Sequence, residues 1–177
     1  MVRLFGTDGI RGRVGTDLTA DLAFRVGRAA AGYFLERGVG RAVLARDTRI
    51  SGGMLANAVL AGVTSAGVNA IDLDVAPTPA VSQILDMESV RPAFGVVVSA
   101  SHNLYEDNGI KLFAETGEKP AQAVEDAIER RMLTTPELDA SGPTVGRIDK
   151  DASLVNEYLH DLRNRFPVKL NKTRLVI

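Results

Sequence analysis

The alternation of short apolar strands with amphipathic helices is the feature that most constrains the fold of this chain. Apolar residues recur at helical spacing from Thr19 to Arg37, where Thr19 is a typical helix cap and Gly38 a typical helix end. Arg41–Arg46 predicts a buried strand, and Gly52–Ser65 predicts a second helix that Gly67 ends. Chains that alternate in this way build sheets of mostly parallel strands covered by helices.

The alternation continues further along the chain and changes at its end. Asn69–Ala76 predicts another strand, and Pro77 and Pro79 precede a short helix. Two strands then follow in succession, Ala93–Ala100 and Gly109–Phe113, with only a short loop between them. Because a short loop joins antiparallel neighbours, the sequence predicts an α/β fold with a mixed, mostly parallel sheet flanked by helices.

The C-terminal part of the chain predicts a change of domain. A helix is expected at Ala121–Leu133, and residues 134–149 are rich in Pro, Gly, Ser and Thr, as linkers and surface loops are. Asp151 is a typical cap for a further helix, and residues 172–177 have the composition of a strand. We therefore expect a first domain at 1–140, a linker at 141–150 and the incomplete start of a second domain at 151–177.

Composition limits the kinds of function that the chain can have. A net charge of −1 and a pI of about 6.1 do not favour binding to nucleic acids or acidic membranes. The absence of cysteine excludes disulfides, thiolate metal sites and thiol nucleophiles. Because no signal segment and no apolar run long enough to span a membrane is visible, we expect a soluble cytoplasmic protein with no membrane partner.

The most informative stretch is Val96–Phe113, VVVSASHNLYEDNGIKLF, in which a buried strand ends in polar residues. Strand ends in open α/β sheets are where ligands usually bind. Ser101 beside His102 suggests a hydrolase, but neighbouring side chains after an extended strand point apart, and no G-x-S-x-G motif is present. A serine that carries a phosphate is the better hypothesis, since His102, Asn103 and Lys111 supply donors and positive charge. An ordinary polar turn is equally consistent with Ser101 alone.

The glycine-rich segment Phe5–Gly12 is a second candidate site. Its three glycines predict a loop that is able to place Arg11 and the Thr7 hydroxyl beside a ligand. The segment fits neither a Walker A motif nor a G-x-G-x-x-G motif, so taken alone it does not identify the ligand.

Turn and cap chemistry explains the remaining polar stretches without a function. Asp47 and Arg49 are expected to pair and fix a turn, while Ser51 caps the helix that follows. Asp107–Gly109 predicts a β-turn between the last two strands of the first domain. His160 is expected to be solvated on the surface of an amphipathic helix.

Four stretches of the chain together resemble the α-D-phosphohexomutase family. They are FGTDGIRG at Phe5–Gly12, RDTRISG at Arg46–Gly52, PTPA at Pro77–Ala80 and SASHNLYEDNGIKLF at Ser99–Phe113. Their order and spacing match over essentially the whole chain, and the first stretch is most similar to that of members acting on glucosamine phosphates. The resemblance implies the first domain, and the beginning of the second, of a four-domain enzyme with a central cleft.

The resemblance also implies how the chain would act. Ser101 is the position that is phosphorylated and exchanges its phosphoryl group with a sugar phosphate substrate through a hexosamine 1,6-bisphosphate. Magnesium is the expected cofactor, bound by the phosphate on Ser101 and by aspartates that this chain lacks. Since the chain also lacks the family's sugar-recognition and C-terminal phosphate-binding loops, we expect the isolated chain to be inactive.

Further site residues follow from the same resemblance. Lys111 is the expected acid/base and charge-stabilising residue, His102 would line the phosphoserine, and Arg11 would reach into the cleft. Thr7 and Asn103 are expected to bind phosphate or substrate.

The chain departs from the family where Leu104 replaces the usual proline, which frees the backbone φ angle at that position. Asp72–Asp74 is expected to belong to a strand rather than to a metal loop. Two alternatives stay open: a member that acts on mannose or glucose phosphates, and a stand-alone binding domain without catalysis. Self-association through the incomplete second domain is a further expectation.

Overall fold

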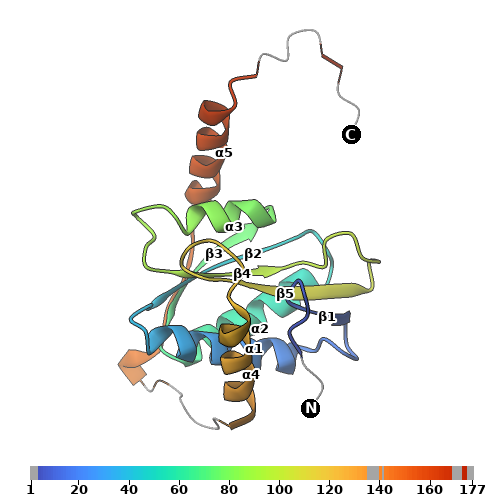
Figure 1. Cartoon of the computed structure of the whole chain (residues 1–177), viewed down its shortest axis with the longest axis vertical. Coiled ribbons are helices and arrows are strands. Elements are labelled where there is room, and N and C mark those ends of the chain that lie inside the picture. The colour runs from blue at the N-terminus through green and yellow to red at the C-terminus, as the bar shows by residue number, and fades with distance from the viewer. Residues whose placement is uncertain (1–3, 135–139, 141, 169–172, 175–177) are drawn as a thin grey trace.

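The computed structural model describes residues 4–134, 140, 142–168 and 173–174. Six strands form one sheet in the order β1-β5-β4-β2-β3-β6 (Figure 1). The strands are β1 (Ile10–Arg13), β2 (Arg41–Arg46), β3 (Asn69–Val75), β4 (Phe94–Val98), β5 (Asp107–Phe113) and β6 (Ile148–Lys150). Strands β2, β3, β4 and β6 are parallel, whereas β5 runs antiparallel to both β4 and β1. The predicted α/β fold with a mixed, mostly parallel sheet is confirmed.

Helices cover both faces of this sheet, which makes a three-layer arrangement. Helices α1, α2 and α4 lie on one face, and α3 and α5 lie on the other (Figure 1). Their bounds are α1 (Ala20–Leu35), α2 (Gly52–Ser65), α3 (Thr78–Ile84), α4 (Gln122–Thr134) and α5 (Ser153–Arg165). Thr19 caps α1 as predicted, because its hydroxyl accepts from the Leu22 N–H at 3.1 Å. Within the described residues, no helix has the length and apolarity that a membrane span requires.

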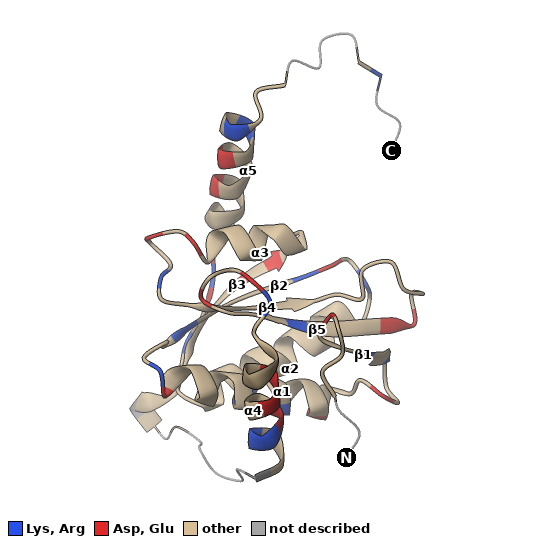
Figure 2. Ribbon diagram, in the orientation of Figure 1, with Lys and Arg blue, Asp and Glu red and all other residues tan. Residues whose placement is uncertain are grey.

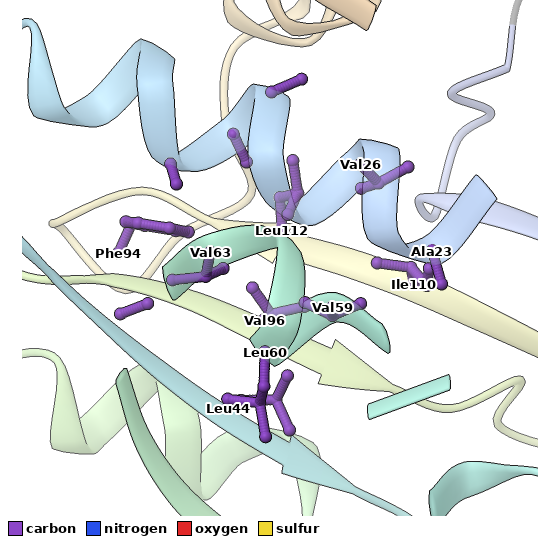
Figure 3. Close-up of a cluster of buried hydrophobic side chains, with 14 of the residues drawn as sticks. Ala23, Val26, Leu44, Val59, Leu60, Val63, Phe94, Val96, Ile110 and Leu112 are labelled. Carbon is purple, nitrogen blue, oxygen red and sulfur yellow. The ribbon is translucent and has the colours of Figure 1, made fainter. Parts of the chain in front are cut away.

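The central strand β4 explains why the core has two halves. All five of its residues are buried, and successive side chains point to opposite faces. Val96 packs against α1 and α2 (Figure 3), and Val98 is buried in the same cluster, whereas Val97 packs on the side of α3. Burial on both faces requires a continuous apolar run, which is what the sequence of β4 supplies.

Two predictions at one edge of the sheet were wrong. Part of the glycine-rich segment expected to be a loop forms β1, which pairs with β5 from Ile10 opposite Ile110 to Arg13 opposite Asp107. Asp107–Gly109 therefore belongs to β5 and makes no turn between strands. The reason is that the chain reverses earlier, before Asp107, and that β1 gives the first residues of β5 a partner.

The segment predicted as a linker is only partly a loop. It contains a 3₁₀ turn, Gly142–Thr144, and β6, which pairs with β3 at the far edge of the sheet. The helix expected after Asp151 is α5, and its Leu154 and Tyr158 are buried in the core cluster that includes α3. Apart from residues 173–174, the strand expected at 172–177 lies outside the described residues, and the division into two domains stays a prediction.

Candidate functional site

The carboxyl ends of β2 and β4 bring two distant segments together. These strands are parallel neighbours with Arg46 opposite Val98, so the loops that follow them leave the sheet at the same edge. The first residue after β2 is tied to β4, since the Asp47 N–H donates to the Val98 carbonyl at 3.0 Å. The loop after β2 carries Arg49 and the loop after β4 carries Ser101, and the side chain of the first reaches the backbone of the second.

Ser101 is exposed near the start of the loop between β4 and β5, and its backbone is in the left-handed region with φ of 57°. Its N–H donates to the Ser99 hydroxyl at 3.0 Å. Its own hydroxyl oxygen lies 3.3 Å from Nδ1 of His102. The expectation that these neighbours point apart was therefore wrong, because it assumed an extended backbone where the chain is left-handed.

Arg49 binds this loop through its whole guanidinium group. Nη2 donates to the carbonyls of Ser101 at 3.1 Å and Asn103 at 2.9 Å. Nη1 donates to the carbonyls of Leu104 at 2.6 Å and Asp107 at 3.0 Å. With Nε bonded to an aspartate, all three nitrogens of the fork have partners, and the side chain is only 13% exposed. Sequence reasoning expected Arg49 to fix its own turn and missed its contacts with the Ser101 loop.

The aspartate that holds Nε is Asp47, as the predicted pair requires. Its carboxylate accepts from Arg49 Nε at 3.1 Å and from the Arg49 N–H at 3.0 Å. It also accepts from the Ser99 hydroxyl at 2.7 Å. Ser99 thus connects Asp47 to the N–H of Ser101, a role that the sequence did not suggest, although Ser99 directly follows a buried strand.

Ser51 does not cap α2, contrary to the prediction. No side-chain hydrogen bond of Ser51 reaches the first turn of the helix; instead its hydroxyl accepts from Asn108 Nδ2 at 2.9 Å. Asn108 is fully buried in β5, and its Oδ1 accepts from the Gly109 N–H at 2.8 Å. A polar side chain buried here needs these partners, which explains why the Ser51 hydroxyl is used for Asn108 rather than for the helix.

A cluster of charged groups lies beside the Ser101 loop. Arg11 Nη1 donates to Asn103 Oδ1 at 3.1 Å, and Arg11 Nη2 binds the carboxylate of Asp8. The same Asp8 oxygen lies 2.8 Å from Lys111 Nζ. Asp8 therefore bridges the two cations that the sequence analysis placed at the site.

Strand pairing explains how Arg11 and Lys111 come to share a face of the sheet. Arg11 lies opposite Gly109, and Lys111 is two residues further along β5, so both side chains leave on the same side. Ile10 and Ile110 point the other way, into the core under α1. Strand β5 begins with an acidic segment and carries a basic one further along (Figure 2).

Electrostatics favours the charged form of Asp8. Partial burial by itself would raise the pKa of this carboxyl. The hydrogen bonds and positive charges of Lys111 and Arg11 outweigh that effect, and the pKa of Asp8 lies below its ordinary value. In the structure Asp8 supplies the negative charge that pairs with these two cations.

The other predicted residues have simpler surroundings. Thr7 is exposed and makes no hydrogen bond with the part of the chain that the structure describes. Leu104 is 75% exposed in the Ser101 loop. His160 is exposed on α5, as predicted, with Nδ1 at 3.1 Å from Asn164 Nδ2.

A magnesium site was tested on the residues present. Within residues 4–134, 140, 142–168 and 173–174, no group of three or more His, Asp or Glu side chains is arranged to hold a metal ion. These residues therefore do not form a magnesium site, and most ligands of such an ion would have to come from elsewhere.

Comparison with known proteins gives consistent results. The family model described as phosphoglucomutase/phosphomannomutase, alpha/beta/alpha domain I, matches residues 2–139. A phosphoglucosamine mutase of Thermobifida fusca (strain YX) is 47% identical over 181 residues, covering 100% of this chain and 40% of the relative. A phosphoglucosamine mutase of Sphingopyxis alaskensis is 43% identical over 182 residues, covering 100% of this chain and 40% of the relative. The chain thus spans about 40% of the length of these curated relatives.

A solved structure agrees with the family model. A phosphoglucomutase/phosphomannomutase family protein from Burkholderia thailandensis superposes with a TM-score of 0.77 at 25% identity. The match covers 91% of this chain and 35% of that protein. Because the family model matches well over half of the residues, this chain belongs to the phosphoglucomutase/phosphomannomutase family.

Proposed function

We propose that this chain carries the phosphoserine of a phosphoglucosamine mutase, which interconverts glucosamine 6-phosphate and glucosamine 1-phosphate. The observation that carries the proposal is the position of Ser101, exposed at the carboxyl end of β4 with Arg11 and Lys111 close to its loop. The names of the relatives support glucosamine phosphate as the substrate, since the matched relatives named above are phosphoglucosamine mutases.

The proposed reaction is two phosphoryl transfers in opposite directions. In the first, the bond from phosphorus to Ser101 Oγ breaks and Oγ takes up a proton, while a bond forms to a hydroxyl oxygen of the sugar phosphate, whose proton passes to a base. In the second, the other phosphoryl group of the 1,6-bisphosphate passes to Ser101 Oγ, whose proton goes to a base, and the sugar oxygen left behind takes up a proton. Such transfers depend on positioning and charge neutralisation more than on covalent chemistry.

The residues of this chain supply both requirements in part. Lys111 and Arg11 would exchange the Asp8 carboxylate for phosphate oxygens, so that their charge stabilises the transferred group. Lys111 is also the candidate for the proton transfers. His102 lies within reach of Ser101 Oγ and would donate to an oxygen attached to it. Magnesium stays an expectation from the resemblance, because the described residues do not form a site for it.

A hexose other than glucosamine is the alternative with a specific observation behind it. The superposed Burkholderia thailandensis protein is named for phosphoglucomutase and phosphomannomutase. A hydrolase with a Ser101–His102 pair is not supported, since no carboxylate within the described residues is hydrogen-bonded to His102. Cytoplasmic location and a sugar phosphate as binding partner are part of the same proposal.

The test uses the protein encoded by the complete gene. Ser101→Ala is expected to abolish conversion of glucosamine 6-phosphate, and the unchanged protein is expected to acquire one phosphoryl group on Ser101 from glucosamine 1,6-bisphosphate. The matched control is Ser65→Ala, which removes a hydroxyl that donates to the Gly62 carbonyl of its own helix. Retained turnover in Ser101→Ala would refute the phosphoryl carrier, and faster turnover of mannose or glucose phosphates would favour the alternative hexose.

A further inference from the structure

Three of the four carbonyls bound by Arg49 fix the direction of the backbone N–H groups that follow them in the loop. In a planar trans peptide, the carbonyl and the N–H of the next residue point in opposite directions. The carbonyls of Ser101, Asn103 and Leu104 point at the guanidinium. The N–H groups of the residues that follow each of them therefore point away from Arg49. These residues are His102, Leu104 and Tyr105.

Those three N–H groups have no hydrogen-bond partner within the described residues, unlike the N–H groups of Ser101, Asn103 and Asp107. The N–H of Ser101 donates to Ser99, that of Asn103 to the Ala100 carbonyl, and that of Asp107 to the Leu104 carbonyl. The N–H groups of His102, Leu104 and Tyr105 make no hydrogen bond with the described residues. All three residues are exposed, so a group attached to the Ser101 hydroxyl can approach them.

We propose that Arg49 is a positioning residue, which draws the loop carbonyls to one side and thereby presents the N–H groups of His102, Leu104 and Tyr105 to the phosphate on Ser101. Backbone N–H groups that converge in a loop bind anions through their partial positive charges. The inference rests on the proposed function, since it takes Ser101 to be the residue that carries phosphate. Arg49 itself touches neither the phosphate nor the substrate.

The test compares amide proton spectra of the 177-residue chain with serine and with phosphoserine at position 101. In the unchanged chain, phosphorylation is expected to move the amide protons of His102, Leu104 and Tyr105 downfield by more than any amide outside the loop. Arg49→Lys keeps the charge but replaces a fork of three nitrogens by one, and it is expected to abolish these shifts.

Arg41→Lys is the matched control. Arg41 also donates to two backbone carbonyls, those of Ser89 at 3.0 Å and Val90 at 2.8 Å, but from the opposite end of β2. This variant is expected to keep the three downfield shifts. Where Arg49→Lys is too unstable to measure, Asp47→Asn removes the charge that holds Nε and is expected to reduce the same shifts.

Two results would overturn the inference: no downfield shift of these amides in the unchanged phosphorylated chain, or equal shifts with and without the Arg49 contacts. Neither depends on turnover. Failure of the proposed function would instead appear as retained mutase activity in Ser101→Ala, so the two failures are distinguishable.

Discussion

The loop that carries Ser101 and the loop that carries Asp8 lie beside the same site, but they are held in different ways. Arg49, 13% exposed, binds the backbone of the first loop at four carbonyls. Asp8, 51% exposed, links the second loop to Lys111 and Arg11 through side-chain ion pairs. An ion pair whose carboxylate is half exposed contributes less to stability than charge-assisted hydrogen bonds shielded from water.

The difference fits the two tasks of a phosphoryl-transfer site. A residue that carries the phosphoryl group has to be held in position before the substrate arrives. In the proposed reaction the cations beside it would change partners as phosphate binds and leaves, and the half-exposed carboxylate of Asp8 is accessible for that exchange.

The largest effect is expected where the Asp8 loop meets β5. A Cβ on Gly9 would lie 2.3 Å from the Ile110 carbonyl oxygen, and Gly9 also has a positive φ of 83°. Gly15 has a similar φ of 88° but nothing within 4 Å of its Cβ position. We expect Gly9→Ala to lower the free energy of unfolding by about 3 kcal/mol and Gly15→Ala by about 1 kcal/mol. Equal losses in urea denaturation would show that the backbone of the Asp8 loop is not fixed by β5.

The second effect concerns the carboxylate that holds Arg49. Asp47→Ala removes the acceptor of three hydrogen bonds, and we expect a loss of about 2 kcal/mol in chemical denaturation. Asp86→Ala, which breaks an ion pair of two side chains that are 54% and 68% exposed, is expected to cost less than about 0.5 kcal/mol. A loss in Asp47→Ala no larger than in this control would mean that the Ser101 loop is held no more firmly than the surface.

A smaller effect is expected from the hydroxyl between Asp47 and Ser101. Ser99→Ala leaves the Ser101 N–H without its acceptor, and we expect a loss of about 1 kcal/mol in the free energy of unfolding. The amide proton of Ser101 should also exchange faster with solvent. Ser65→Ala is the control, because among the described residues its hydroxyl bonds within α2. Unchanged exchange of the Ser101 amide proton would mean that the Ser99 hydroxyl does not hold the loop in place.

The smallest effect is that of pH on the Asp8 contacts. The pKa of Asp8 is lower in the folded chain than its ordinary value of 3.8, so its contribution to stability is present above that value and lost as pH falls through the folded pKa. Asp8→Asn should therefore be slightly less stable than the unchanged chain near neutral pH. The two should converge as pH falls below the folded-state pKa of Asp8. A difference that does not change with pH would mean that the Asp8 charge is not paired in solution.

The layers of the fold were predictable because they follow from apolar periodicity. Val96–Val98 is a continuous apolar run, and the helix from Ala20 to Leu35 has apolar residues at helical spacing. Strand β1 was missed because glycine content suggested a loop, while its pairing with β5 is a tertiary contact that no local pattern shows. For the same reason β6 was not visible inside a segment rich in turn residues.

The sequence singled out residues that the structure brings together, but not the geometry in which they lie. Ser101, His102, Lys111 and Arg11 were expected from their motifs, and the Asp47–Arg49 pair from its spacing of two residues. The reach of Arg49 to the carbonyls of another loop depends on β2 and β4 being adjacent, which the sequence does not state. Likewise the Ser101–His102 contact depends on one backbone angle.

Amide hydrogen exchange of the unphosphorylated chain is the most direct test of whether Arg49 holds the Ser101 loop. The N–H groups of Ser101, Asn103 and Asp107 are all hydrogen-bonded within or next to this loop. If Arg49 holds the loop, Arg49→Lys will accelerate their exchange at least tenfold, about 1.4 kcal/mol of local stability, while the amides of β4 stay protected. Unchanged exchange at these three amides in a folded Arg49→Lys chain would contradict it.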